Sequence, residues 1–301
     1  MRKRKGTLKK ISRKRKSLKE KLVQISFIMP SIIGVSIFFA IPFGVIIYYS
    51  MVKSPFNPEF VFLDNFKALL SNSAFLQAAK NTIRFSALAV PLAVLLSLGF
   101  AMILEQNIPM KSTFRTFFLT PMMVPTASVV LIWQVFFNYN GVINEFVQKL
   151  GGDKIDWIKS THAGIIILVL FLWKNLGYNM ILFLAALSAI PKEYMEVASL
   201  DGANSWQMFF YIKLRYLSPT ILFVAIMSLI NSFKVFREVY LMTGDYPYDT
   251  LYMLQHFMNN TFKSLDYQKL SAAAVLMFIV VIAIIALMFV LEHYFGKDVE
   301  G

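Results

Sequence analysis

The sequence predicts an all-α membrane protein that crosses the bilayer six times, and its composition and hydropathy both indicate this. Hydrophobic residues make up 57% of the 301 residues and charged residues only 16%, with a mean hydropathy of +0.59. A soluble protein usually has about 25% charged residues. A bilayer span needs about 20 mostly apolar residues. Six stretches meet that requirement, at approximately 23–51, 79–105, 115–138, 163–190, 216–242 and 268–293.

The net charge of +13 is concentrated at the N-terminus. Residues 1–22 contain 12 Lys and Arg and one Glu, so they carry +11 and leave +2 for the rest of the chain. Such a basic tail is retained in the cytoplasm, and anionic lipid attracts it by about 1 kcal/mol per basic residue. With six spans, both termini are then expected in the cytoplasm. Membrane lipid accounts for the basicity, and we expect no nucleic-acid partner.

A short amphipathic stretch follows the first span, and the third span contains two prolines. In the outer loop after the first span, Phe66 and Leu69 recur at near-helical spacing, which predicts a short amphipathic helix. The third span contains Pro121 and Pro125. Proline in a membrane helix leaves backbone carbonyls that neighbouring helices or water must satisfy.

The fourth span carries polar residues at membrane depth. If it enters from outside near Ala163, Lys174 lies about 16 Å along the helix, close to the middle of the bilayer. A lysine there costs at least ~2.5 kcal/mol, so we expect it to face a polar cavity or a partner helix. Asn175 and Asn179 are four residues apart and share a helix face.

The fifth span presents Asn231, Lys234, Arg237 and Glu238 in its outer half. In one interpretation Lys234 pairs with Glu238 one turn away, and Arg237 extends to the lipid headgroups. In the other, these residues line a hydrophilic path or hold an outer gate against a partner subunit. The candidates for such a path are Lys174, Asn175, Asn179, Asn231, Lys234 and Arg237.

Two short helices are predicted between the fourth and fifth spans. Pro191 suits a first helical turn, and Gly202 suits a left-handed residue after a helix. Asn204 and Gln207 then form a capping-box pattern, and Pro219 marks the start of the next span. A polar helix-turn-helix tethered to a membrane is a surface that another protein can grip, although an ordinary interhelical loop is the alternative.

The same segment contains a long residue pattern. Glu196-Val197-Ala198 precedes Gly202 by three residues, and Ile212-Lys213-Leu214 follows nine residues later. This resembles the cytoplasmic coupling loop of binding-protein-dependent ABC importer permeases, which reads Glu-Ala-Ala, three residues, Gly, nine residues and Ile-x-Leu-Pro. Two positions depart from that pattern. Val197 replaces an Ala, and Arg215 replaces the Pro that would help to stop the second short helix.

Two further sequence motifs, Asp201-Gly202-Ala203 and Leu217-Ser218-Pro219, are similar to those of the sugar-importer branch of this family. The resemblance extends from about residue 60 to 292. It implies a type I ABC importer permease fold in residues 23–301, with a transmembrane core at about 76–292 and a coupling loop at about 191–215. The basic tail at 1–22, identified from its charge, precedes this domain.

The resemblance also implies a function in the bacterial inner membrane. The chain looks like a permease subunit that passes a sugar, oligosaccharide or sugar-like solute, similar to maltose F-type and glycerol-phosphate A-type permeases. The partners implied are a second permease, two ABC ATPase subunits and an extracytoplasmic solute-binding protein. The coupling residues implied are Glu196, Ala198, Asp201, Gly202, Ile212 and Leu214.

Several chemistries are not expected. The chain has no G-x-x-x-x-G-K-[ST] phosphate loop, so ATP hydrolysis is expected on a separate subunit, and the chain is not expected to be an enzyme. It has no Cys and three scattered His, so no metal site or cofactor is expected.

Two alternatives remain open. Glu105 and Glu238 near span ends leave room for a secondary transporter driven by an ion gradient. Transport that stops when ATP hydrolysis is blocked would exclude that mechanism. A membrane scaffold without a solute path is the other alternative, and a dry, apolar surrounding of Lys174 would favour it.

Overall fold

A computed structural model describes residue 20 and residues 23–54, 56, 58–106 and 108–296. The predicted basic tail at 1–22 therefore lies outside the described residues, except for Glu20. The prediction of an all-α chain with six membrane spans is confirmed for the described part. The described residues also contain an isolated antiparallel β-bridge between Val52 and Phe60. The helices long and apolar enough to span a membrane are Val23–Ser50, Ser73–Glu105, Thr126–Lys149, Ala163–Ser188, Ser205–Thr243 and Tyr267–Tyr294.

The chain divides into two compact units, Met1–Phe66 with Tyr267–Val275, and Lys67–Asp266 with Leu276–Gly301. In the first unit, helical residues 23–35 continue into η1 (Ser36–Ala40) and α2 (Ile41–Ser50). The Asn65 side-chain amide donates to the Ser50 and Val52 carbonyls at 3.0 and 2.9 Å. These bonds hold the turn after α2 against the start of α3 (Asp64–Leu70), the short helix predicted from Phe66 and Leu69.

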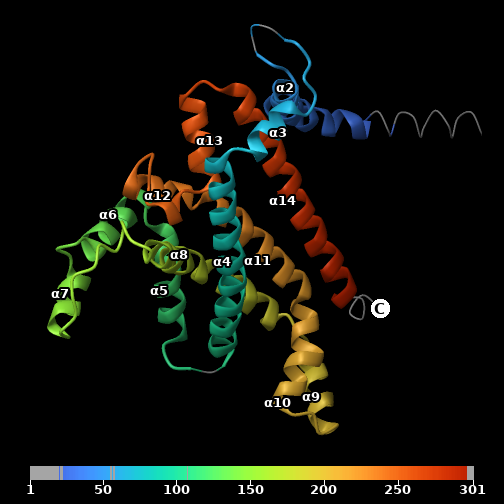
Figure 1. The fold of residues 1–301 in the computed structure, drawn as a ribbon. Helices are drawn as coiled ribbons and strands as arrows, with labels where there is room; N and C mark the ends of the chain where they lie inside the picture. The colour runs from blue at the N-terminus through green and yellow to red at the C-terminus, as the bar shows by residue number, and fades with distance from the viewer. Residues whose placement is uncertain (1–19, 21–22, 55, 57, 107, 297–301) are drawn as a thin grey trace, which may run out of the picture. The chain divides into compact units, whose positions relative to one another are not determined.

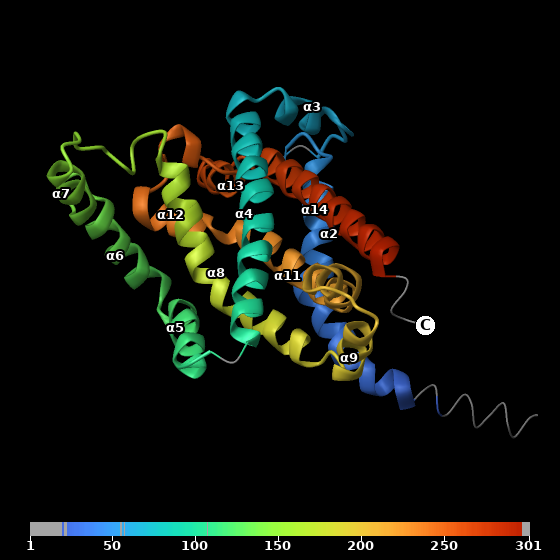
Figure 2. The same ribbon diagram turned by 90° about the horizontal axis from the view of Figure 1, so that it is seen from below.

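The centre of the second unit is α8 (Ala163–Ser188), which contacts α4 (Ser73–Glu105), α5 (Lys111–Met123) and α11 (Leu214–Lys234) (Figure 2). Small residues on the buried face of α4, such as Ala93 and Ala101, allow close approach. Large side chains from the other helices fill the remaining space, including Phe183 and Leu217, which are fully buried. These contacts form the packed core that supports the predicted site residues.

Gly177 marks the closest approach of α8 to α5. A Cβ atom there would overlap the Phe118 carbonyl oxygen and lie 3.0 Å from the Leu119 amide nitrogen. We expect Gly177→Ala to lower the free energy of unfolding by about 1–3 kcal/mol, because backbone atoms cannot move aside as a side chain can. Gly164→Ala in the same helix is the control, since nothing lies within 4 Å of its Cβ position. Equal thermal midpoints for the two purified variants would contradict this packing.

The predicted continuous third span at 115–138 is wrong. Helix α5 ends at Met123, Val124 is extended with φ −81° and ψ 131°, and α6 (Thr126–Phe137) begins after Pro125. A proline disfavours the helical conformation at the residue before it, which explains the break at Val124. The long apolar stretch instead combines α6 with α7 (Val142–Lys149).

The segment after α8 contains the two predicted short helices, α9 (Lys192–Leu200) and α10 (Ser205–Met208). The capping box is confirmed, because the Asn204 side chain accepts from the Gln207 amide at 2.9 Å and the Gln207 side chain accepts from the Asn204 amide at 2.8 Å.

The predicted new start at Pro219 is wrong. Helical backbone runs from α10 through the π-helical turn η2 (Phe209–Lys213) into α11, and Pro219 lies inside α11. The chain has Arg215 where the resembled family has the proline that would help to stop this helix, so the helix continues.

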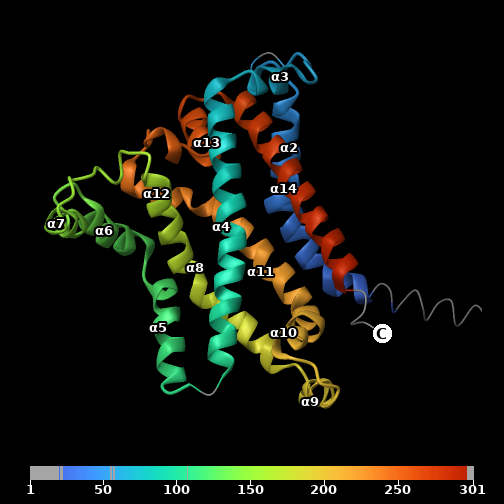
Figure 3. The same cartoon turned by 60° about the horizontal axis from the view of Figure 1, so that its bottom comes forward.

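The chain after α11 contains further helices. After a turn at Val235 come α12 (Phe236–Thr243), the short η3 (Asp249–Leu251), α13 (Leu254–Lys263) and α14 (Tyr267–Gly296). Figures 1 and 3 show α9 and α10 at one end of the second unit, with α12 and α13 at the opposite end. The two groups of predicted functional residues are therefore well separated.

Candidate functional site

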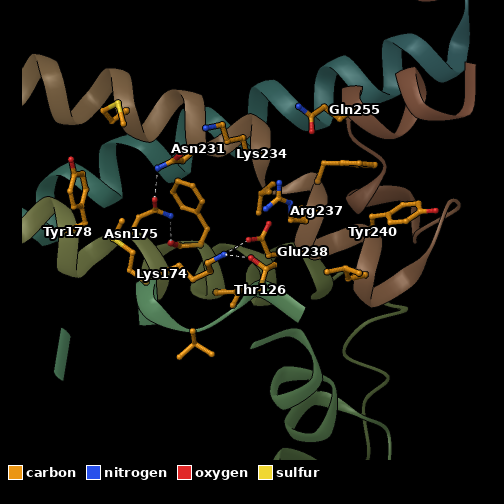
Figure 4. Close-up of a pocket in the computed structure, with 18 residues that line it drawn as sticks. Thr126, Lys174, Asn175, Tyr178, Asn231, Lys234, Arg237, Glu238, Tyr240 and Gln255 are labelled. Carbon is orange, nitrogen blue, oxygen red and sulfur yellow. Dashed lines mark hydrogen bonds and ion pairs between the residues drawn. The ribbon is translucent and has the colours of Figure 1, made fainter. Parts of the chain in front are cut away.

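A cavity of about 1000 Å³ lies where α8, α11 and α12 meet the break between α5 and α6. Figure 4 shows its polar lining. Val124 and Val235, where the helices break, are both lining residues, so irregular backbone occurs next to the cavity. The polar and charged lining residues are Thr126, Lys174, Asn175, Tyr178, Asn231, Lys234, Arg237, Glu238, Tyr240 and Gln255.

Lys174 forms an ion pair with Glu238 across the cavity wall (Figure 4). Its ammonium also donates to the Thr126 hydroxyl at 3.3 Å. The side chains are 20% and 9% exposed, so both charges are largely removed from solvent. The pairing of Lys234 with Glu238 that one interpretation of the sequence assumed is therefore wrong. Glu238 follows the turn at Val235 and is directed at α8 instead.

Two asparagines of α8 join it to α11. The Asn231 side-chain amide donates to Asn175 Oδ1 at 2.8 Å, and Asn175 donates to the Phe171 carbonyl at 2.8 Å. Asn179 donates to the Ser228 hydroxyl at 3.1 Å, and both of these side chains are buried. Asn179 is not part of the cavity lining, although Lys174, Asn175, Asn231, Lys234 and Arg237 are. The structure thus brings together five of the six residues that the sequence proposed for a path.

Lys234 and Arg237 line the cavity with exposed side chains. Lys234 belongs to the last turn of α11 and Arg237 to the first turn of α12. Within the described part of the chain, neither side chain has a hydrogen bond or an ion pair. Uncharged polar lining residues that the sequence did not propose for a path are Thr126, Tyr178, Tyr240 and Gln255. For Thr126, the preceding Pro125 was an available signal of a helix start.

His256 packs behind the cavity wall. It is 1% exposed, and its ring lies 4.6 Å from the ring of Phe236, a lining residue. Its Nδ1 accepts from the Met253 amide at 3.3 Å, while its buried Nε2 has no partner among the described residues. Burial lowers the pKa of the His256 imidazole from 6.5 to about 4. The folded protein therefore favours the neutral form of the His256 imidazole.

This burial predicts a pH-dependent stability. Between pH 6.5 and about 4 the unfolded chain binds a proton at His256 and the folded chain does not, so stability falls as the pH falls through that range. The loss is about 3 kcal/mol. Thermal midpoints measured from pH 4 to 8 should show a flatter dependence in His256→Gln. The exposed His162 provides the control, and the hypothesis fails if His162→Gln flattens the profile equally.

Most residues of the predicted coupling loop at 191–215 are exposed. Glu196, Asp201 and Gly202 lie at the surface, Ala198 is half-buried, and Ile212 and Leu214 are half-buried in the helix that follows. Gly202 has φ +80°, and the Ala203 amide donates to the Ala198 carbonyl at 2.9 Å. This hydrogen bond with a left-handed glycine ends α9.

Residues 197–211 also carry exposed apolar side chains. Leu200 is 88% exposed and Trp206 is 72% exposed, with Val197 and Tyr211 also above half. Exposed apolar side chains gathered on one surface are typical of a protein–protein interface.

An ion pair connects this region to α4. The Lys213 ammonium lies 2.6 Å from a Glu105 carboxylate oxygen, and both side chains are partly buried. Glu105 and Glu238 were the carboxylates that left an ion-gradient mechanism open, and each is paired with a lysine here. In the described ranges no three His, Asp or Glu side chains lie together as metal ligands do.

Comparison with known proteins identifies the family. Residues 89–301 match the family described as "Binding-protein-dependent transport system inner membrane component". The sn-glycerol-3-phosphate transport system permease protein UgpA of Salmonella choleraesuis is 32% identical over 265 residues, or 85% of this chain and 89% of that protein. The trehalose/maltose transport system permease protein MalF of Thermococcus litoralis is 30% identical over 261 residues, or 85% of this chain and 88% of that protein.

Solved structures show the same fold. A chain of the bacterial alginate ABC transporter, crystallised with an alginate pentasaccharide-bound periplasmic protein, matches with a TM-score of 0.80 at 21% identity. The match covers 94% of this chain and 98% of that chain. The chain therefore belongs to the family of binding-protein-dependent transport system inner membrane components, and it is the multi-pass membrane permease of an ABC importer whose ATPase is a separate subunit.

Proposed function

We propose that this permease passes a sugar, oligosaccharide or sugar-like solute through a path that includes the cavity at Lys174. The observation that carries the proposal is a polar, 1000 Å³ cavity between helices of membrane-spanning length. Charged side chains in membrane-spanning helices almost always face the bundle interior or a water-filled cavity, where they mark solute pathways. The names of UgpA and MalF, for sn-glycerol-3-phosphate and trehalose/maltose transport, support the solute class.

The proposed partners are a second, different permease, two ATPase subunits and an extracytoplasmic solute-binding protein. The ATPase is proposed to grip α9 through its exposed residues. In this scheme Gly202 provides the turn, Ala198 allows close approach, and Glu196 and Asp201 supply charged contacts. Ile212 and Leu214 anchor the helix that follows.

Continuous helical backbone connects the region after α9 with the cavity, so motion of α9 can be transmitted to the cavity. Helical backbone from Ser205 to Lys234 would be about 45 Å long at 1.5 Å per residue, so a displacement at its start moves its far end. That far end carries Asn231 and Lys234, which line the cavity. The Lys213–Glu105 ion pair would carry the same displacement to α4.

Orientation in the membrane is part of the proposal. Both termini and α9 are proposed to be cytoplasmic, with α13 on the outer side. Because the chain has no Cys, single cysteines at the exposed Ser199 and Ser264 provide a direct test. A membrane-impermeant thiol reagent should label Ser264→Cys in intact cells and Ser199→Cys only after permeabilisation. The reverse pattern would contradict the assignment of α9 as an ATPase contact.

Reconstitution tests the energy source. The permease should be assembled with its partner permease, ATPases and binding protein in proteoliposomes that carry an imposed ion gradient. Blocking ATP hydrolysis is expected to stop uptake although the gradient persists. Uptake that continues under these conditions would show a gradient-driven transporter and would overturn the proposal.

A further inference from the structure

The cavity lining carries more positive than negative charge. Its charged members are Lys174, Lys234, Arg237 and Glu238, which amounts to three cations and one carboxylate, a net charge of +2. Lys174 and Glu238 neutralise each other in their ion pair. The excess charge therefore resides on Lys234 and Arg237.

Neither of these two cations has a negative partner among the described residues. Both belong to the membrane-spanning segment Ser205–Thr243, where an unbalanced cation is unfavourable. Both have exposed side chains on the cavity wall, and Figure 4 shows Lys234 beside Asn231 and Arg237 beside Glu238. A negatively charged group in the cavity would balance them.

The wall that carries these cations is held in place from both sides of the turn at Val235. The Asn231–Asn175 hydrogen bond joins α11 to α8, and the Glu238–Lys174 ion pair joins α12 to α8. These contacts hold the helix ends that carry the two cations, so an anion would have to order only the two side chains and not the backbone. The planar guanidinium of Arg237 can donate two parallel hydrogen bonds to a carboxylate, phosphate or sulfonate, and Lys234 adds a point charge.

We infer that the transported solute carries an anionic group and that Lys234 and Arg237 bind this group in the path. The inference rests on the proposed function, since it requires the cavity to be part of the path. The neutral polar groups of Asn175, Tyr178 and Gln255 in the same lining are suited to sugar hydroxyls. A neutral sugar would leave the two cations unbalanced.

The test uses the complete transporter in proteoliposomes and pairs of probes that differ in charge. These are galactose and galacturonate, glycerol and sn-glycerol 3-phosphate, and galactotriose and trigalacturonate. The acidic member of at least one pair is expected to be taken up with ATP at least tenfold better than its neutral partner. For that probe, Lys234→Gln/Arg237→Gln should raise the KM of uptake at least tenfold, and Arg237→Lys should recover part of the loss.

Matched controls are Lys80→Gln and Arg84→Gln on α4, which are exposed and do not line the cavity. They should leave the KM unchanged. Preference for neutral probes would overturn the inference and leave the proposed function intact. Loss of the partner permease from the purified double variant would also overturn it, because the cations would then hold a subunit interface. ATP-dependent uptake of none of the probes would count against both proposals.

Discussion

Gly202→Pro is expected to abolish ATP-driven uptake while the chain still inserts in the membrane. Gly202 has φ +80°, and proline fixes φ near −65°. The substitution also removes the amide that donates to the Ser199 carbonyl at 3.1 Å. Both changes alter the turn between α9 and α10, the surface proposed to contact the ATPase. ATP-dependent uptake and solute-stimulated ATP hydrolysis in proteoliposomes measure the effect.

Gly151 offers a matched control for this experiment. It has φ +82°, its amide donates to the Gln148 carbonyl at 3.0 Å, and nothing lies within 4 Å of its Cβ position, as at Gly202. Gly151→Pro imposes the same backbone conflict far from α9 in the sequence and should retain most of the uptake. Gly202→Asn should also retain activity, because asparagine tolerates the left-handed conformation. Normal uptake by Gly202→Pro, or an equal loss of uptake in Gly151→Pro, would contradict the proposed coupling role of Gly202.

Lys174→Met is expected to lower the free energy of unfolding by about 3–5 kcal/mol. It leaves the buried Glu238 carboxylate without its cation, and an uncompensated buried charge is strongly destabilising. Adding Glu238→Leu should recover most of this loss, because the double variant buries no charge. Thermal midpoints of the purified wild type, both single variants and the double variant form a double-mutant cycle.

The exposed ion pair of Lys53 with Glu59 is the control for this cycle. Its side chains are 61% and 59% exposed, so Lys53→Met should change stability by no more than about 1 kcal/mol. If the effects of Lys174→Met and Glu238→Leu simply add, the two residues are not coupled and the ion pair does not support the cavity wall.

The sequence by itself determined the features that depend on neighbouring residues. Long apolar runs predicted six spans, because a bilayer requires about 20 apolar residues in succession. The Asn204–Gln207 capping box and the left-handed turn at Gly202 were also predictable, since each needs only residues within one or two helical turns. The family pattern around Glu196 and Gly202 is local for the same reason.

Only the tertiary structure decided which residues meet across the fold. Glu238 has a lysine four residues earlier but pairs with Lys174, 64 residues away, because the helix breaks at Val235 and α12 packs on α6, from where the Glu238 side chain reaches α8. Asn179 shares a helix face with Asn175 yet is buried against Ser228, since α11 covers that part of α8. The break at Val124 has a local cause in Pro125, but its place in the cavity wall depends on where α5 packs on α8. Helix period and hydropathy constrain single helices, whereas the cavity is the product of contacts between helices far apart in the chain.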